Sequence, residues 1–196
     1  MARPRKFDED EVLRVARDRF WTTGYAATSL DDVLKDTGLG KGSLYAAFGD
    51  KHALFLRAFD GYCAGLVEGI GGRLDGPDED ALDRLHALVT AVAEATAADT
   101  CFRGCLLANG TAELSGRDPE VRAAAHRTYT ALREQLAEAV AAAQRAGAID
   151  PAAAPDRLAL LLLAVLRGIE ALGKGAVGGD ALRSIAETAL SLLPRP

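Results

Sequence analysis

The sequence predicts an all-α protein, with an N-terminal module of three helices and a C-terminal body of six helices. Alanine, leucine, glutamate and arginine dominate long segments, and these residues favour helix. Valine, isoleucine, threonine and aromatic residues never gather into the alternating runs of a β-strand. Hydrophobic residues make up 49% of 196 residues, which is enough for a substantial core.

Three short helices are expected first, at about residues 8–24, 29–38 and 41–48. Ser29 and Asp32 have the spacing of a capping box, although Thr28 could also cap the second helix. A glycine-containing turn joins the second helix to the third. The sequence therefore predicts a helix-turn-helix.

Six helices are expected in the body, at about residues 51–74, 82–96, 105–114, 119–147, 155–172 and 180–193. Their starts and stops carry the usual signals, such as Asp118-Pro119 before one helix and Pro194 after the last. We place two domains, at residues 1–50 and 51–196.

The net charge of −5 is unevenly distributed. Residues 1–57 contain ten Lys/Arg and nine Asp/Glu, so the acidity lies in the remainder of the chain. This balance argues against a general polyanion binder, but it allows a local basic face that meets phosphate.

The chain is expected in the cytoplasm. Its three cysteines are an odd number, which does not fit a secreted disulfide scaffold. No apolar run follows Met1, and the longest apolar stretch, residues 158–166, is too short to span a bilayer.

The segment GLGKGSLYAAFGDKHAL, residues 38–54, carries the strongest functional signal. Gly40 and Gly42 keep the start of the third helix slim, so that the backbone can approach DNA closely. The free N–H groups at a helix start also favour a phosphate.

The side chains of this helix fit a DNA groove. Lys41 and Ser43 can reach phosphate oxygens or a guanine edge, and Tyr45 can contact phosphate or a thymine methyl. Core packing is the alternative for Tyr45 and Phe48. Phe48 follows Leu44 by four residues and belongs to the core, whereas Tyr45 lies one residue off that face.

Residues 10–57 closely resemble the DNA-binding region of tetracycline-repressor-type (TetR) transcriptional regulators. The shared residues, in family order and spacing, are Ala16, Phe20, Gly24, Tyr25, Thr28, Ser29, Val33, Gly38, Gly42, Leu44, Tyr45, Phe48, Lys51 and Leu54. Departures are Gly40, where the family usually has a small polar residue, and Ala46-Ala47, where a histidine or tyrosine often stands.

The resemblance implies a set of DNA contacts on the helix-turn-helix, at the start of the fourth helix and in a basic N-terminal arm. These are Thr28, Ser29, Gly40, Lys41, Gly42, Ser43, Tyr45, Lys51, His52, Arg3, Arg5 and Lys6. The arm could reach the minor groove, or it could simply be solvated.

The resemblance also implies a homodimer whose body binds a small molecule. The last two helices are apolar enough to support dimerisation independently, although burial within one chain is the alternative. The expected interface residues are Leu158, Leu161, Leu162, Val165, Ile169, Leu182, Ile185, Ala189 and Leu192.

Candidate effector contacts are mostly polar groups on apolar faces of the body. They are Tyr62, Leu66, Cys105, Asn109, Glu113, Tyr129, Arg167 and Glu170. Each also has a structural interpretation; Arg167 and Glu170, three residues apart, can pair with each other. The small apolar surroundings predict a hydrophobic or weakly polar effector.

Residues 101–109 resemble the start of the sixth helix in a TetR branch where a Gly-Cys-Leu run is common. Some members of that branch respond to electrophiles or oxidants through a cysteine there. A helix start and the neighbouring Arg103 can both lower the pKa of the Cys105 thiol, although a buried cysteine is usually inert.

Gly61, Gly65 and Gly69 form a stripe on the fourth helix, each at a cost of about 1 kcal/mol against alanine. The simple explanation is close approach of a neighbouring helix. The alternative is a hinge that lets this helix tilt when effector binds.

No enzyme, cofactor or metal site is predicted. The histidines are scattered at 52, 86 and 126, and no nucleophile motif or phosphate loop accompanies them. A metal held by Cys101 and Cys105 with a histidine lacks the paired Cys-x-x-Cys spacing.

The sequence therefore predicts a ligand-responsive DNA-binding transcriptional regulator, most simply a repressor released by a small hydrophobic or electrophilic effector. Its partners would be near-palindromic double-stranded operator DNA, the effector and a second copy of the chain, with no membrane. A cysteine-based redox or electrophile sensor and an effector-independent DNA-binding protein are the alternatives.

Overall fold

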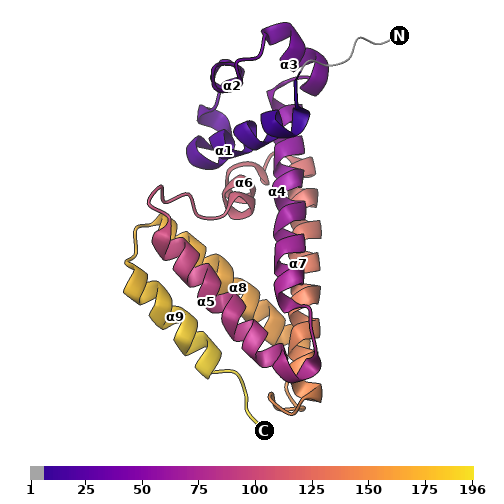
Figure 1. Ribbon diagram of the computed structural model, residues 1–196, viewed down its shortest axis with the longest axis vertical. Helices are drawn as coiled ribbons and strands as arrows, with labels where there is room; N and C mark the ends of the chain where they lie inside the picture. The colour runs from indigo at the N-terminus through magenta and orange to yellow at the C-terminus, as the bar shows by residue number, and fades with distance from the viewer. Residues whose placement is uncertain (1–6) are drawn as a thin grey trace, which may run out of the picture.

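The computed structural model describes residues 7–196, and helices form all the regular secondary structure in that range (Figure 1). The helices are α1 (Glu9–Ala27), α2 (Leu30–Thr37), α3 (Lys41–Phe48), α4 (Lys51–Leu74), α5 (Ala81–Ala98), α6 (Leu106–Leu114), α7 (Pro119–Arg145), α8 (Pro155–Lys174) and α9 (Gly179–Ser191), with a 3₁₀ turn η1 (Asp78–Asp80). The all-α prediction is confirmed. The predicted arm residues Arg3, Arg5 and Lys6 lie outside the described residues.

Local capping sets the limits of the short α2. The backbone N–H of Asp32 donates to Ser29 Oγ at 3.1 Å, and the N–H of Ser29 donates to Asp32 Oδ2 at 2.9 Å. Gly38 then ends the helix with φ 68°, a left-handed conformation that favours glycine. The predicted capping box is confirmed, with Ser29 rather than Thr28 as the cap.

Gly24 was expected to end the first helix, but it breaks α1 instead. With φ 82° and ψ 169°, Gly24 leaves helical geometry, and the chain resumes a short helical turn that runs to Ala27. The break frees backbone N–H groups just after Gly24, and these find a partner from another helix, described below.

Aromatic packing fixes α1 against the upper part of α4 (Figure 1). The ring of Phe20 meets that of Phe55 edge-on at 5.1 Å, and Phe55 stacks on Phe59 at 5.4 Å. Tyr25 also meets Phe55 edge-on at 5.1 Å. Aromatic pairs of this geometry stabilise a contact by about 0.5–1.5 kcal/mol beyond their burial.

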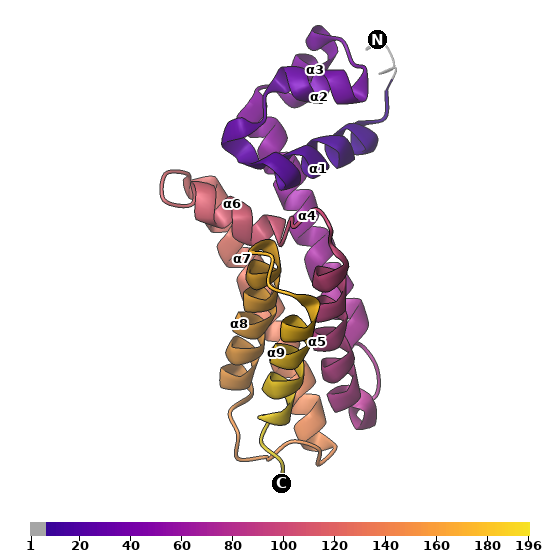
Figure 2. The same ribbon diagram turned by 90° about the vertical axis from the view of Figure 1, so that its left-hand side faces the viewer.

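The body is a helical bundle below the N-terminal module. The long helices α4 and α7 pack side by side along the molecule, and α8 packs against α7 and α5 (Figures 1 and 2). α9 covers α5 and α8, and α6 lies between α1 and the bundle (Figure 2). One core of buried apolar residues runs from α1 through α9.

The glycine stripe on α4 faces open space. A Cβ placed on Gly61, Gly65 or Gly69 would meet no atom within 4 Å. Close approach of a neighbouring helix is therefore the wrong explanation for these three residues. Gly71, further along α4, differs, since a Cβ there would lie 2.7 Å from Nε2 at the end of the Gln135 side chain.

The predicted interface set on α8 and α9 separates into two groups. Leu162, Ile169 and Leu182 are at most 1% exposed, so they belong to the core of their own chain and their assignment to the interface is wrong. Leu161 and Leu192 are 50% and 71% exposed. These two residues line a shallow groove of about 320 Å³ with Val165, Ser184, Ile185, Thr188 and Ala189. Leu158, the remaining member of the set, is half-buried.

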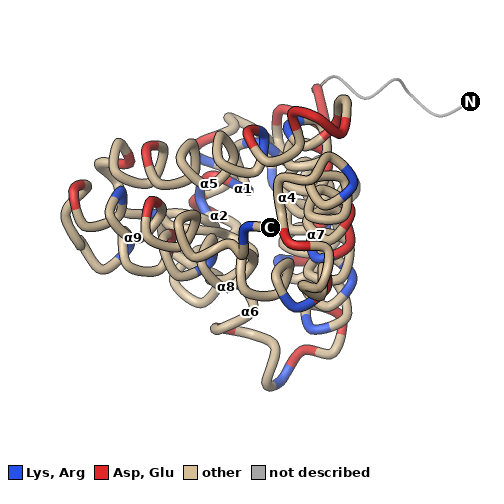
Figure 3. The backbone as a smooth tube through the Cα atoms, turned by 90° about the horizontal axis from the view of Figure 1, so that it is seen from below, with Lys and Arg blue, Asp and Glu red and all other residues tan. Residues whose placement is uncertain are grey.

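Acidic and basic residues are interspersed around the body (Figure 3). Within residues 7–196, no helix combines the length and the apolar character that a membrane span requires.

Candidate functional site

The helix α3 presents a polar face to solvent. Leu44 and Phe48 are 0% and 4% exposed and anchor the helix to the core, which confirms the core interpretation of Phe48. Lys41, Ser43 and Tyr45 are exposed on the outer side, and the side chain of Tyr45 is 44% exposed although it is large and aromatic. The outer face of α3 is thus free to meet a partner.

The start of α3 is narrow. Gly40 is the N-cap and supplies no side-chain acceptor for the first N–H groups of the helix. A Cβ on Gly40 or Gly42 would meet nothing within 4 Å, so neither glycine is needed for packing inside the chain. This geometry leaves the helix N-terminus accessible to a phosphate.

Two of the predicted DNA contacts are engaged within the chain. Thr28 is 2% exposed and its hydroxyl donates to the carbonyl of Gly24 at 2.7 Å, which contradicts a direct phosphate contact. His52 lies 2.6 Å from Asp118 through Nε2, and so ties the start of α4 to the N-cap of α7. His52 therefore acts as a structural link in this conformation.

Ser29 and Lys51 stay near the surface. Ser29 is exposed although its hydroxyl also donates to Asp32. The ammonium of Lys51 lies 4.3 Å from the centre of the Tyr25 ring and 3.4 Å from the carbonyl oxygen of Ala26. These contacts hold Lys51 beside the end of α1.

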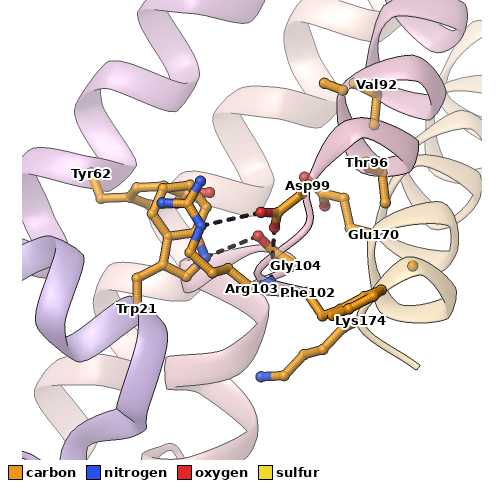
Figure 4. Close-up of a pocket in the computed structure, with 12 residues that line it drawn as sticks. Trp21, Tyr62, Val92, Thr96, Asp99, Phe102, Arg103, Gly104, Glu170 and Lys174 are labelled. Atoms are coloured by element: carbon orange, nitrogen blue, oxygen red, sulfur yellow. Dashed lines mark hydrogen bonds and ion pairs between the residues drawn. The ribbon is translucent and has the colours of Figure 1, made fainter. Parts of the chain in front are cut away.

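A cavity of about 230 Å³ opens between the N-terminal module and the body (Figure 4). Trp21 of α1 and Tyr62 of α4 form one side, and the rings meet edge-on at 5.0 Å. The rest of the lining comes from α5, from the loop of residues 99–104 and from α8, through Val92, Ala95, Thr96, Asp99, Phe102, Arg103, Gly104, Glu170, Gly173 and Lys174.

Trp21 joins α1 to the loop that precedes α6. Its Nε1 donates to the carbonyl of Gly104 at 2.9 Å, and the guanidinium of Arg103 lies 4.5 Å from the centre of its ring (Figure 4). The carboxylate of Asp99 shapes the same loop by accepting from the backbone N–H of Arg103 at 2.8 Å. Trp21 was not among the predicted site residues, because its hydrogen-bond partner lies 83 residues away in the sequence.

A buried polar cluster lies beside this cavity. Arg167 Nη1 approaches Cys105 Sγ at 2.9 Å and Glu170 Oε2 at 2.9 Å, and the hydroxyl of Tyr62 donates to Cys105 Sγ at 3.5 Å. The predicted pairing of Arg167 with Glu170 is confirmed.

Burial dominates the ionisation of this cluster. It raises the pKa of the Cys105 thiol, and it raises the pKa of Tyr62 far above its usual range. The expectation that Arg103 would help to lower the pKa of Cys105 is wrong, because Arg103 stacks on Trp21 and pairs with Asp99.

Two predicted effector residues hold the chain together instead. The carboxylate of Glu113, on α6, accepts the backbone N–H of Tyr25 at 2.9 Å and that of Ala26 at 2.7 Å. Asn109 Nδ2 donates to the carbonyl of Arg103 at 2.7 Å. We call the two hydrogen bonds of Glu113 the Glu113 bridge, since they connect the body to the backbone N–H groups that follow the break in α1.

Asn109 and Glu113 also line a groove of about 410 Å³ between α1 and α6. Trp21 and Lys174 line both this groove and the cavity. Tyr129 is half-buried, and burial raises the pKa of its hydroxyl. Leu66 is half-buried one turn further along α4 from Tyr62.

Among residues 7–196, the group that brings three metal-type ligand atoms within 4.8 Å of one another is His52, Asp118 and Glu120. Its atoms are already in use, because Asp118 caps α7 and the two nitrogens of His52 face different carboxylates. Despite burial, hydrogen bonds from His52 and the backbone N–H of Val121 lower the pKa of Asp118.

Comparison with known proteins covers most of the chain. Residues 12–58 match the family model "Bacterial regulatory proteins, tetR family", and residues 81–186 match "Tetracyclin repressor-like, C-terminal domain". The HTH-type transcriptional repressor ComR of Escherichia coli K12 is 27% identical over 192 residues, which cover 98% of this chain and 91% of ComR.

Solved structures agree with this match. A cysteine mutant of the TetR family transcriptional regulator CifR, complexed with 26-bp double-strand operator DNA, is 26% identical, with a TM-score of 0.84 over 98% of this chain and 100% of that chain. A TetR transcriptional regulator from Chloroflexus aurantiacus J-10-FL is also 26% identical, with a TM-score of 0.81 over 93% of this chain and 91% of that chain.

Proposed function

Because the chain belongs to the TetR family of bacterial transcriptional regulators, we propose that it is a homodimeric repressor that binds operator DNA through α3 and releases it when a small molecule occupies the body. The observation that carries this proposal is the free polar face of α3, where Lys41, Ser43 and Tyr45 stand outward from the buried Leu44 and Phe48. Such a face fits the major groove, where side chains reach base edges and phosphates. The name of ComR and the operator complex of CifR support the same role.

The groove on α8 and α9 supports the dimer. Leu161 and Leu192 are large, apolar and at least half exposed, and a second copy of the same surface would cover them. Two copies related by a two-fold axis would present two α3 helices to successive major grooves, about 34–36 Å apart. The operator is then near-palindromic.

We place the domain boundary between residues 50 and 51, where Asp50 caps α4. The three N-terminal helices then carry most of the DNA contacts, with Lys51 at the start of α4, and the six that follow carry the dimer contacts and most of the effector contacts. The same function implies a location in the cytoplasm, where the DNA is. It also implies that the protein binds its effector without catalysing a reaction on it.

Cysteine-based sensing is a second candidate. Arg167 Nη1 lies 2.9 Å from Cys105 Sγ, and a cation at that distance stabilises a thiolate. The thiol is nevertheless 2% exposed and its pKa is raised by burial, so a reagent must first open the cluster. Mass spectrometry after treatment with an electrophile, with the operator affinity measured in parallel, separates this candidate from reversible effector binding.

Operator selection from random duplex DNA tests the main proposal. After selection, Tyr45→Ala should lower operator affinity by about ten- to a hundredfold, the loss expected from one contact of about 1–3 kcal/mol. Tyr45→Phe is the matched control that keeps the ring. Circular dichroism should show both variants folded, since the side chain of Tyr45 is 44% exposed and is not part of the buried core.

Equal operator affinity of wild type and Tyr45→Ala would remove Tyr45 from the interface. A purified chain that stays monomeric and ignores every duplex at low salt would refute the proposed function itself.

A further inference from the structure

The cavity in Figure 4 takes one wall from the DNA-binding module. Trp21 belongs to α1, whereas the other lining residues belong to the body and its loops. Trp21 also donates to Gly104 and carries Arg103 on its ring, so the contacts between α1 and the 99–104 loop run along the edge of the cavity. A molecule in this cavity would touch both parts of the protein at once.

One cation of the cavity lining stands outside the ion pairs of this region. Asp99 pairs with Arg103 at 3.5 Å, and Glu170 pairs with Arg167 at 2.9 Å. Lys174 completes the set, and no ion pair within residues 7–196 involves its ammonium. The two pairs are neutral together, so Lys174 favours an anionic occupant.

Unsatisfied hydrogen-bond donors point the same way. Nε and Nη2 of Arg167, the partner of Glu170, are buried and have no hydrogen-bond acceptor. Arg103 Nε is also buried, and its facing acceptor, Asp99 Oδ1, lies 3.5 Å away, too far for a good hydrogen bond. Glu170 Oε2 is the one buried acceptor of this region without a hydrogen bond, and it already faces Arg167. Buried donors without acceptors destabilise a protein, and a ligand rich in acceptor oxygens removes that cost.

The remaining walls suit a small flat molecule. The volume of about 230 Å³ is below the range of about 300–1,000 Å³ typical of ligand pockets. Trp21 and Tyr62 offer aromatic surface on one side. Phe102 stands on the lining with φ 51°, a strained conformation for a bulky residue, and its side chain is 51% exposed.

We propose, on the basis of the proposed function, that the effector is a small planar monocarboxylate whose carboxylate lies between Lys174 and Arg103 and whose apolar part lies against Trp21 and Phe102. When the effector binds, it competes with Arg103 and Gly104 for contact with Trp21. Because Trp21 belongs to α1, the loss of these contacts moves α1 directly. Trp21 is therefore a positioning residue through which the effector acts on the DNA-binding module.

The single tryptophan of the chain makes this testable without a label. The probes are benzoate and cinnamate, their neutral amides benzamide and cinnamamide, and the cation benzylamine. Either acid should change the emission of Trp21 in a saturable way and release the selected operator. The amides and the amine should bind at least about tenfold more weakly, since they lack the anionic group.

Variants assign the charge preference. Lys174→Gln should abolish the advantage of acid over amide, whereas Arg73→Gln should leave it intact. Arg73 is the matched control because it is also an exposed cation in the last turn of a helix, α4, and does not line the cavity. Trp21→Phe should still bind the acid in calorimetry but should weaken its effect on operator affinity.

The outcomes separate the two proposals. Binding of benzylamine as tight as that of the acids would overturn the assigned class in favour of a cation that pairs with Glu170. If neither acid gives a saturable signal up to about 10 mM, its binding free energy is weaker than about 3 kcal/mol. That result would overturn the proposed site, provided that the protein without acid still binds its operator. Untreated protein that fails to bind any operator would instead refute the proposed function.

Discussion

Removal of the Glu113 bridge should cost more stability than removal of any ordinary surface carboxylate. The bridge supplies acceptors to the N–H groups of Tyr25 and Ala26, which the break at Gly24 deprives of helical partners. A hydrogen bond to a charged group contributes about 1.5–3 kcal/mol, and here one donor is half-buried and the other is exposed. With the exposed bond discounted for competing water, Glu113→Ala should lower the free energy of unfolding by about 2–3 kcal/mol.

The assay is urea denaturation followed by circular dichroism, at a fixed protein concentration because a dimer is expected. For a chain of this size, the same loss corresponds to a fall in Tm of about 4–12 °C. Glu113→Gln keeps an uncharged acceptor and should recover about half of the loss. Glu187→Ala, at an exposed position of α9, is the matched control and should change stability by less than about 0.5 kcal/mol.

A loss in Glu113→Ala no larger than in Glu187→Ala would refute the reasoning. It would mean that water satisfies both N–H groups as well as the carboxylate does, and that apolar packing and the contacts of Trp21 are enough to hold α1 to the body.

The remaining predictions concern glycines, cysteines and pH. Gly61→Ala, Gly65→Ala and Gly69→Ala should each stabilise the chain by up to about 1 kcal/mol in urea denaturation, since their Cβ positions are open, whereas Gly71→Ala should not because its Cβ would meet Gln135. If α4 is also a hinge, the triple variant should need more effector for operator release; unchanged release with raised stability sinks that idea. Iodoacetamide at pH 8 should modify the exposed Cys101 before the other two cysteines, as followed by peptide mapping. The reason is that burial raises the pKa of Cys63 to about 11 and also raises the pKa of Cys105. Equal modification of all three cysteines would contradict this packing. The lowered pKa of Asp118 contributes stability that is fully present above the unfolded pKa of about 3.9 and is lost as pH falls below that value and through the lower pKa of the folded state. The stabilities of wild type and Asp118→Asn should therefore stay apart from pH 7 to about pH 4 and converge at more acidic pH, and a constant gap would refute this.

Helix limits could be predicted from the sequence because their causes are local. Ser29 and Asp32 cap α2 within four residues, and Asp118-Pro119 opens α7 with a cap and a first-turn proline. Gly38 ends α2 through its own backbone conformation. None of these signals depends on where the helix lies in the fold, so each predicts the same helix limit before and after the tertiary structure is known.

Which apolar side of a helix faces its own core could not be predicted. Leu161 and Leu162 are neighbours of identical chemistry, yet one is 50% exposed and the other 1%. α8 is apolar over much of its surface, so periodicity does not separate the inner face from the face that a second copy would cover. The helices that pack against α8, which are α5, α7 and α9, make that choice, and the residue pattern of α8 alone does not reveal where they lie.

The functional contacts that the sequence missed are also long-range. Trp21 reaches Gly104 across 83 residues, and Glu113 reaches Ala26 across 87. Thr28 shows the converse, since it has a residue type suited to phosphate but is 2% exposed and donates its hydroxyl to the carbonyl of Gly24 at the end of α1. The residue type indicates which contacts a side chain can make, and the fold decides whether that side chain faces solvent or packs against another helix.

These long-range contacts converge on one helix. The backbone of α1 donates hydrogen bonds to the carboxylate of Glu113 on α6, and Trp21 of α1 donates to the carbonyl of Gly104 in the loop before α6. The guanidinium of Arg103 also lies on the ring of Trp21. All three partners lie within residues 103–113, so a displacement of that segment changes several contacts of α1 together. α1 in turn packs on α4 through Phe20 and Phe55, and it contacts α2. A small molecule that moves residues 103–113 therefore need not bend the long α4 to reorient α3, because α1 gives it a shorter route through contacts of about 3 Å.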